Sequence, residues 1–424
     1  MLSELRSGVG RVSLTPAIGA SLVGFKGRAS GCTSIQDDLY ATALVLDSGG
    51  EQMAILSCDL LAVHPDIVAH VRDLVRTSTG IPADRVAICC SHTHSGPPGH
   101  ATAGSHRIDQ AYAAYLPYLL AGAVRLAHAN LTPSPIGHGA TTATIGINRR
   151  EVIGAGETIL GNNPDGPVDA EVGVLRVDDQ DGVPLATLIN YACHPVILGP
   201  GSTVVSADFV GRTREIVEAE TGAPMLFLQG ACGDINPMSG VTDDYAHCIS
   251  LGTVLGTAVM KAHSAIATER GTVKLAAHKS EVELPLRPLS HSEAASPAGA
   301  EMQEVRDREF PWGVPTGEVG PRMEIQVLAL ADLGLVMVAA EPFAQTGMVV
   351  KSASPWARTF FVGYANGCIG YVPTADAYPN GGYEVNVAHL LYGLPAPVAP
   401  QAESMLVQAC TSALGSLARP VSDK

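Results

Sequence analysis

The sequence predicts an α/β fold with a layered, mixed β-sheet core flanked by helices and a metal site at the strand ends. Two observations support this prediction. Short apolar runs of about strand length each finish in a polar residue and a turn, and segments with helical periodicity separate several of them. Continuous apolar runs are typical of strands covered on both faces. In such folds, ligands bind at the carboxyl ends of the strands.

The predicted strands and helices alternate along most of the chain. The strands are "MAILSCD" ending at Asp59, "VAICCSHTH", "ATLINYACHP" reaching His194, "MLFLQGACGD" reaching Asp234, "LGLVMVAAE" ending at Glu341, and "FFVGYANG" ending at Asn366. The helices are "HPDIVAHVRDLVRTST", "AAYLPYLLAGAVRLAHA" and "VGRTREIVEAET". This alternation indicates stacked layers of helix and sheet. The sequence shows no internal repeat.

We expect the 424 residues to form a single domain, 1–424, because one compositional break alone interrupts them. That break is the segment 287–321, which is polar, rich in Pro and Gly and poor in aromatic residues. Loops of this length inside compact domains are usually functional or disordered. The segment is therefore either an insertion that acts as a lid over the site or a surface excursion.

The amino-acid composition indicates which kinds of partner the protein binds and in which cellular compartment it works. A net charge of -15 argues against nucleic acid and anionic membrane surfaces, which would repel the protein. The chain opens without an apolar signal segment and contains no 18-residue apolar stretch. Nine cysteines without paired spacing predict buried free thiols in a reducing compartment. We therefore expect a cytoplasmic protein that acts on a small molecule, without stable membrane association.

Candidate metal ligands follow three of the predicted strands. His92 and His94 lie two residues apart, and on a strand this spacing places both imidazoles on one face. His194 and Glu341 would complete an N/N/O donor set that suits zinc with an open position. Two alternatives remain open from these residues alone. The histidines can be hydrogen-bonded loop residues, and the carboxylate can bind turn amides.

These residues belong to a series of segments that resembles the neutral/alkaline (non-lysosomal) ceramidase family, zinc-dependent amidases that cleave the N-acyl bond of ceramide. The resemblance covers nearly the whole length, in order. It runs through "GVGRVSLTP", "GF", "SHTHSGP", "INRR", "NNPDGPVDAEVGVLRVD", "NYACHPV", "SADFVG", "FLQGACGDINP", "AAEPFAQTG" and "GYVPTADAYPNGGYE". Each segment is a loose pattern, but chance does not place so many in order.

The resemblance implies a ligand set and a proton carrier. Zinc would be held by His92, His194, Glu341 and Tyr371, and His94 would be the general acid/base. A nearby imidazole of this kind can protonate a leaving amine. A phenol is an unusual zinc ligand. The alternative is that Tyr371 is a hydrogen-bonded tyrosine of the core.

Three further residues are candidates for contact with the reacting groups. The resemblance places Arg149 of "INRR" near the substrate, where it would stabilise an oxyanion or a polar head group, with a surface ion pair as the alternative. Tyr383, with Tyr378 less favoured, is the candidate donor to a tetrahedral intermediate. Asn236 stands in "GDINP" where the family has a serine, so a nucleophilic serine is excluded there. Its amide can still donate a hydrogen bond.

The sequence is compatible with three functions. The favoured one is a zinc-dependent hydrolase that cleaves an N-acyl amide bond by a metal-bound hydroxide. The alternatives are a zinc-dependent esterase or lactonase and a non-enzymatic ligand-binding relative. We expect the protein to lack the C-terminal immunoglobulin-like domain and the secretion signal of classical members of the family. It is also only 5% aromatic, and Phe310 and Trp312 are the large aromatics of the polar 287–321 segment. We therefore expect a soluble amide or ester to be a better substrate than long-chain ceramide.

Overall fold

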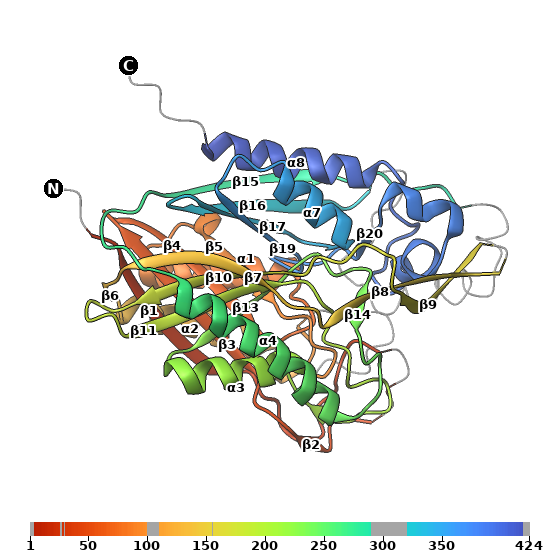
Figure 1. The fold of residues 1–424 in the computed structure, drawn as a ribbon, viewed down its shortest axis with the longest axis horizontal. Helices are drawn as coiled ribbons and strands as arrows, with labels where there is room; N and C mark the ends of the chain where they lie inside the picture. The colour runs from red at the N-terminus through yellow and green to blue at the C-terminus, as the bar shows by residue number, and fades with distance from the viewer. Residues whose placement is uncertain are drawn as a thin grey trace.

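The computed structural model describes residues 4–25, 28, 30–99, 110–154, 156–289 and 320–418. Three sheets form its centre (Figure 1). The first contains β5 (Val86–Cys90), β4 (Glu51–Cys58), β3 (Tyr40–Ser48), β1 (Arg6–Ser13) and β6 (Thr132–Pro133), in that order. The second contains β13 (Met225–Gln229), β11 (Pro184–Tyr191), β10 (Glu171–Asp178) and β7 (Ile136–Thr142). The third contains β19 (Arg358–Val362), β17 (Leu333–Val338), β16 (Arg322–Leu330) and β15 (Leu275–Glu283).

Helices cover the outer faces of these sheets. The pair α1 (Pro65–Thr79) and α2 (Gln110–Ala129) belongs to the first sheet, α3 (Phe209–Thr221) and α4 (Tyr245–Ala265) to the second, and α7 (Ala344–Ser352) and α8 (Ala402–Ala418) to the third. Figure 1 shows α7 and α8 along one side of the molecule and α3 and α4 along the opposite side. This arrangement confirms the predicted α/β class. Each predicted helix and strand corresponds to an element of its expected type, but most predicted strand runs extend three or more residues past the end of the strand.

Short strands and helical turns complete the fold. The strands are β2 (Ser34–Ile35), β8 (Gly146–Ile153), β9 (Glu157–Asn163), β12 (Val204–Val205), β14 (Ile235–Pro237), β18 (Glu341–Pro342) and β20 (Tyr371–Val372). The helical turns are η1 (Ala83–Arg85), η2 (Ala375–Asn380), η3 (Tyr383–Val387) and η4 (Ala388–Leu390). Two of these groups matter for the site: β14, β8 and β9 form a small antiparallel sheet, and β18 pairs in parallel with β20.

One topology occurs three times along the chain. In each sheet an antiparallel hairpin is followed by a helical crossover to a parallel edge strand: β3-β4-α1-β5, β10-β11-α3-β13 and β16-β17-α7-β19. The structure thus repeats a topology, although the sequence shows no internal repeat. The repeat leaves no sequence pattern because burial requires apolar side chains at equivalent positions but not the same ones.

The three sheets share a central apolar core, which explains why their strands read as continuous apolar runs. In β4, Met53 and Ile55 face this shared core, whereas Ala54 and Leu56 face the core beneath the helices. In β17, Leu335 faces the shared core in the same way. A strand alternates its side chains between two faces, so a strand buried on both faces is apolar at every position.

The carboxyl ends of the parallel strand pairs meet at one place. Backbone hydrogen bonds join them: Cys90 N donates to Tyr364 O at 3.1 Å, Gly363 N to Gln229 O at 3.0 Å, and Gly233 N to Pro342 O at 2.9 Å. The loops that leave β5, β11, β13, β17 and β19 therefore converge. A ligand site at the strand ends follows from this topology.

Three further expectations concern the rest of the chain. Most of the 287–321 segment lies outside the described residues, so its role as a lid stays a prediction; its flanks join two neighbouring strands, with Leu284 N donating to Pro321 O at 3.1 Å. All nine cysteines are free and buried, as predicted. Among the helices that the structure describes, none has the length and apolarity needed to cross a membrane.

Candidate metal centre

Three candidate ligands from three different sheets converge at the junction. His92 follows β5, His194 follows β11, and Glu341 follows β17. The Nε2 atoms of His92 and His194 each lie 3.4 Å from Glu341 Oε2, and all three side chains are buried. Ligand atoms about 2.0 to 2.1 Å from a tetrahedral zinc ion lie about 3.4 Å apart. The spacing of these donors therefore fits the ion that the sequence predicts.

The hydrogen bonds of the two rings show which nitrogen is available. His92 Nδ1 lies 2.8 Å from Leu61 O, and His194 Nδ1 lies 2.6 Å from Cys232 O. A carbonyl oxygen only accepts, so each Nδ1 carries the proton and each Nε2 presents a lone pair. Two lone pairs and a carboxylate oxygen thus face one another without a proton between them. A bound cation would interact favourably with all three of these groups.

Burial favours the neutral form of two of these histidines. Burial, reinforced by the nearby Arg149, lowers the pKa of His194 to about 4. Burial also lowers the pKa of His94 well below its ordinary value, and His92 and His194 act in the same direction. His194 is therefore neutral at pH 7, the form in which imidazole binds a metal.

His94 differs from the other two histidines in its hydrogen bonds. Its Nε2 lies 3.3 Å from His92 Nε2, whereas its buried Nδ1 has no hydrogen-bond partner in the described part of the chain. The ring nitrogens of His92, His94 and His194 all lie within 4.8 Å of one another, so the three form a group that can hold a metal ion. His94 alone lacks the carbonyl contact that fixes the tautomer of the other two.

The prediction that a strand places the rings of His92 and His94 on one face is wrong. β5 ends at Cys90, so neither histidine lies on a strand, and His92 has a φ of 67° in the left-handed region. The turn of this loop, and not the pleat of a strand, brings the two rings together. Strained backbone of this kind is common at functional sites.

Two tyrosines that sequence reasoning missed hold the carboxylate of Glu341. The hydroxyl of Tyr364 donates to Oε2 at 3.2 Å, and the hydroxyl of Tyr392 donates to Oε1. The ring of Tyr364 also lies 4.0 Å from the ring of His92. Tyr364 lies within the predicted strand "FFVGYANG", just after β19 ends, and this position is a signal that could have identified it, whereas Tyr392 has no such signal.

Arg149 lies in a buried polar network and not in a surface ion pair. Its Nη2 donates to the Tyr371 hydroxyl at 3.0 Å, its Nη1 to Asn236 Oδ1 at 3.2 Å, and its Nε to Glu384 Oε1 at 2.8 Å. Tyr371 pairs with Glu341 across β18 and β20. The structure thus brings Arg149, Asn236 and Tyr371 to the site, and the role of Tyr371 as a ligand stays a prediction.

The two candidate tyrosine donors face different directions. The ring of Tyr383 lies 5.7 Å from that of Tyr371, and the guanidinium of Arg149 lies 5.8 Å from the Tyr383 ring. The hydroxyl of Tyr378 instead donates to Val398 O at 2.7 Å. The structure therefore brings Tyr383, and not Tyr378, to the site.

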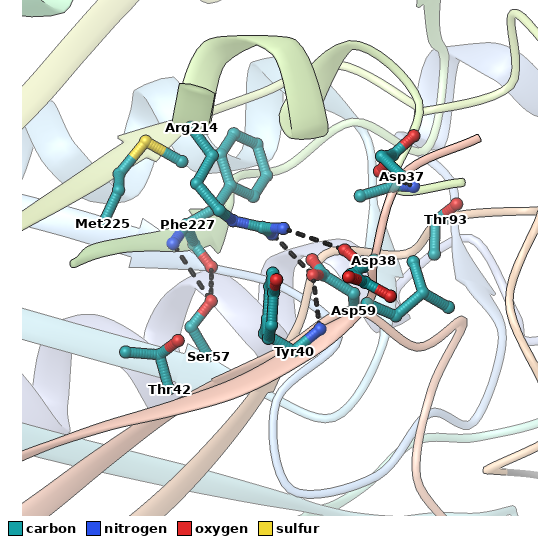
Figure 2. A network of polar contacts seen from close by, with 12 residues as sticks. Asp37, Asp38, Tyr40, Thr42, Ser57, Asp59, Thr93, Arg214, Met225 and Phe227 are labelled. Atoms are coloured by element: carbon teal, nitrogen blue, oxygen red, sulfur yellow. Dashed lines mark hydrogen bonds and ion pairs between the residues drawn. The ribbon is translucent and has the colours of Figure 1, made fainter. Parts of the chain in front are cut away.

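A second network of polar contacts includes Thr93, in the loop that carries His92 and His94 (Figure 2). Arg214 donates to Asp59 Oδ2 at 2.5 Å, and the same oxygen accepts from Tyr40 N, which joins α3 to the ends of β3 and β4. Thr93, between the two histidines, donates to Ser206 O at 2.7 Å, and Asp37 accepts from the Ser206 hydroxyl. Burial raises the pKa of Asp37 to about 6.

Comparison with known proteins identifies the class to which this fold and site belong. Residues 6–248 match the family described as neutral/alkaline non-lysosomal ceramidase, N-terminal. The match covers more than half of the 424 residues, and the chain belongs to this family.

Individual members show how far the similarity extends. The chain is 24% identical to neutral ceramidase B of Dictyostelium discoideum over an alignment of 217 residues, and the match covers 45% of this chain and 29% of that protein. The match thus spans less than a third of that relative. The crystal structure of neutral ceramidase from Pseudomonas aeruginosa superposes with a TM-score of 0.78 at 19% identity, covering 98% of this chain and 74% of that one. A ceramidase complexed with C2 gives 0.78 at 18% identity, with coverages of 97% and 75%. These structures share the fold.

Proposed function

We propose that this protein is a zinc-dependent hydrolase that cleaves an N-acyl amide bond. The observation that carries the proposal is the convergence of two imidazoles with fixed tautomers and one carboxylate, beside a third imidazole whose tautomer is not fixed. Membership of the ceramidase family supports an amide as the bond that is cleaved.

The donor set supports zinc as the metal. His92, His194 and Glu341, with Tyr371 as a fourth ligand, would hold the ion, and imidazole with carboxylate is a set that zinc accepts. When bound, zinc would polarise the substrate carbonyl and lower the pKa of a water molecule to about 7. Tyr364 and Tyr392 would keep the Glu341 carboxylate in place through their hydrogen bonds.

His94 is the proposed proton carrier. A proton carrier must bind and release a proton during each turnover, so its ring needs a nitrogen without a permanent hydrogen bond. Nδ1 of His94 has no partner in the part of the chain that the structure describes, whereas Nδ1 of His92 and of His194 each face a carbonyl. His94 would take the proton of the attacking water and deliver it to the leaving amine.

Arg149 and Tyr383 would stabilise the negative charge that develops on the carbonyl oxygen. Hydrogen bonds to Glu384 and Asn236 fix the orientation of the Arg149 guanidinium before the substrate binds. Donors oriented in advance lower the barrier because no reorganisation is needed during the reaction. Tyr383 contacts Tyr371 and Arg149 and would supply a second donor.

For the substrate, we propose an amide with a short or polar acyl part. The net charge of -15 supports this preference, because it opposes contact with anionic lipid. The β8–β9 hairpin, which carries Arg149, has the exposed apolar side chains Val152, Ile153, Ile159 and Leu160. Substrate chain length is therefore the variable to measure.

The test is a matched series of N-acyl and O-acyl substrates of rising chain length, assayed with zinc. We expect amides to be cleaved, with kcat/KM highest for short or polar acyl groups. A kcat/KM that climbs to the longest chain, together with binding to liposomes, would make long-chain ceramide the substrate. Turnover of the esters alone would make the protein an esterase, and no turnover in either series would leave a non-enzymatic relative.

A further inference from the structure

We infer that Gly24, Phe25 and Arg28 position the imidazole of His94. None of the three is a candidate metal ligand, and all lie in the segment between β1 and β2. The inference rests on the proton-carrying role proposed for His94 under "Proposed function". It supplies what that role requires: a ring that is held in place without a hydrogen bond to Nδ1.

The backbone of Gly24 packs against one edge of the His94 ring. Its φ is +109°, and a Cβ atom built on it would lie 2.4 Å from His94 Nδ1 and 2.5 Å from His94 Cγ. Real Cβ atoms do not approach other atoms so closely, so only glycine fits here. The backbone of Gly24 thus packs against the ring edge that carries Nδ1.

Phe25 packs against the same ring. Its centroid lies 4.9 Å from the His94 centroid, with an angle of 57° between the planes. The guanidinium of Arg28 lies 5.2 Å from the centroid of the Phe25 ring, a distance at which a cation and an aromatic ring attract each other. Phe25 is therefore itself held in place, and it limits rotation of the imidazole.

Arg28 fixes the backbone that carries the ring. Its Nη1 donates to His94 O at 2.7 Å, and its Nη2 donates to Gly199 O at 2.8 Å in the loop that follows His194. One side chain thus joins the two loops that carry the histidines. Lysine could not replace it, because an ammonium on a flexible chain does not reach two carbonyls in a fixed fork geometry.

The burial of Arg28 indicates that this contact is specific. The residue is 6% exposed; burial lowers the pKa of its guanidinium to about 10, and the negative charge of Asp243 acts in the opposite direction. Burying a guanidinium is costly, so its position is best explained by the carbonyls of Val23, His94 and Gly199 to which it donates.

The three histidines are thus held by two different means. Carbonyl oxygens hold the Nδ1 atoms of His92 and His194, which fixes each tautomer for metal binding. Packing against Gly24 and Phe25 and the tether from Arg28 hold His94, which fixes the place of the ring and leaves its protonation free to change.

The test compares Gly24→Ala with Gly19→Ala. Gly19 also has a positive φ, +92°, but a Cβ there meets no atom within 4 Å, so it controls for backbone strain. We expect Gly24→Ala to lower kcat roughly 10- to 100-fold with KM and zinc content nearly unchanged, because a displacement of about 1 Å can cost that much. Gly19→Ala should keep kcat within about twofold of the wild type.

Two further variants keep the inference testable if Gly24→Ala does not fold. Phe25→Leu and Arg28→Lys should both lower kcat while zinc content is retained. Crystal structures of the metal-free variants supply a readout independent of activity: we expect the His94 ring to leave its position 3.3 Å from His92 Nε2. The inference is overturned if the ring stays in place and kcat is unchanged, or if zinc is lost along with activity. Failure of the proposed function would appear instead as a wild-type protein without hydrolase activity, and the crystal structures would still decide the position of the ring.

Discussion

The hydroxyl of Tyr364 donates a hydrogen bond of 3.2 Å to Glu341 Oε2, the oxygen that faces both candidate histidine ligands. Tyr364 is buried and has a φ of 53°, so the surrounding structure holds it in a strained conformation. Its ring also packs on His92. One side chain thus orients two candidate ligands from two different sheets.

Replacing Tyr364 with Phe removes that hydrogen bond and keeps the ring. We expect zinc affinity, measured by competition with a chelator, to fall by roughly 10- to 100-fold, because partners of this kind orient the ligand. Tyr191→Phe is the matched control, since the buried hydroxyl of Tyr191 donates to Ala143 O and contacts no candidate ligand. Equal zinc affinity in the two variants would contradict the orienting role of Tyr364.

His94→Ala separates proton transfer from metal binding. We expect zinc content near that of the wild type and turnover lowered by roughly 10² to 10⁴, the usual contribution of a general acid/base. His92→Ala should instead lose the metal. If His94→Ala loses zinc to the same extent, the three-histidine group is the metal site and His94 is a ligand.

Tyr383→Phe and Tyr378→Phe test the direction in which the two hydroxyls face. Tyr383 adjoins Arg149 and Tyr371, so its variant should lose kcat by roughly 10- to 1000-fold, as removal of an oxyanion donor does. Tyr378 donates to Val398 O, so its variant should change stability and not kcat. A larger loss of kcat in Tyr378→Phe would reverse the assignment.

Glu384 compensates two buried arginines and should be important for folding. It accepts from Arg149 Nε at 2.8 Å and from Arg150 Nη1 at 2.5 Å. Glu384→Ala leaves both cations unpaired, so we expect the free energy of unfolding in urea to fall by about 3 to 5 kcal/mol. Glu157→Ala, at an exposed position of the β8–β9 hairpin, is the control. A loss below 1 kcal/mol in Glu384→Ala would show that the pairs contribute little.

Asp37 should make stability depend on pH. Burial raises the pKa of this carboxyl from 3.8 to about 6, so the folded protein holds its proton more tightly than the unfolded chain. The resulting stabilisation is complete below about pH 4 and is lost as the pH rises through 6. The free energy of unfolding should therefore fall between pH 4 and 7 by about 2 to 3 kcal/mol more in the wild type than in Asp37→Asn.

Urea unfolding at several pH values measures this difference. Asp181→Asn, on an exposed turn, is the control for the substitution itself, so the difference between the two variants isolates the buried position. An Asp37→Asn protein that follows the wild-type pH dependence would contradict the assignment.

The sequence predicted the parts of the site that follow apolar runs. His194 and Glu341 could be identified because each follows a strand buried on both faces, and such apolar runs are recognisable in the sequence. The proximity of His92 and His94 was expected for the wrong reason, because a left-handed residue in a loop has no pattern in the sequence.

Other parts of the site depend on contacts between distant segments. Arg28 binds His94 O across 66 positions, and Glu384 reaches Arg149 across 235. Residue type alone does not specify such pairs, since the fold decides which of many polar side chains meet. The threefold topology escaped prediction for a related reason: its repeats share the order of their elements and not their residues.

The most direct test of the central claim is a zinc titration of the metal-free protein, followed by hydrolysis of a short-chain N-acyl amide. We expect activity to rise in proportion to added zinc and to level off at one equivalent per chain, and Glu341→Ala to show neither tight binding nor activity. Full hydrolysis in the presence of a strong chelator, or unchanged zinc binding in Glu341→Ala, would contradict the account.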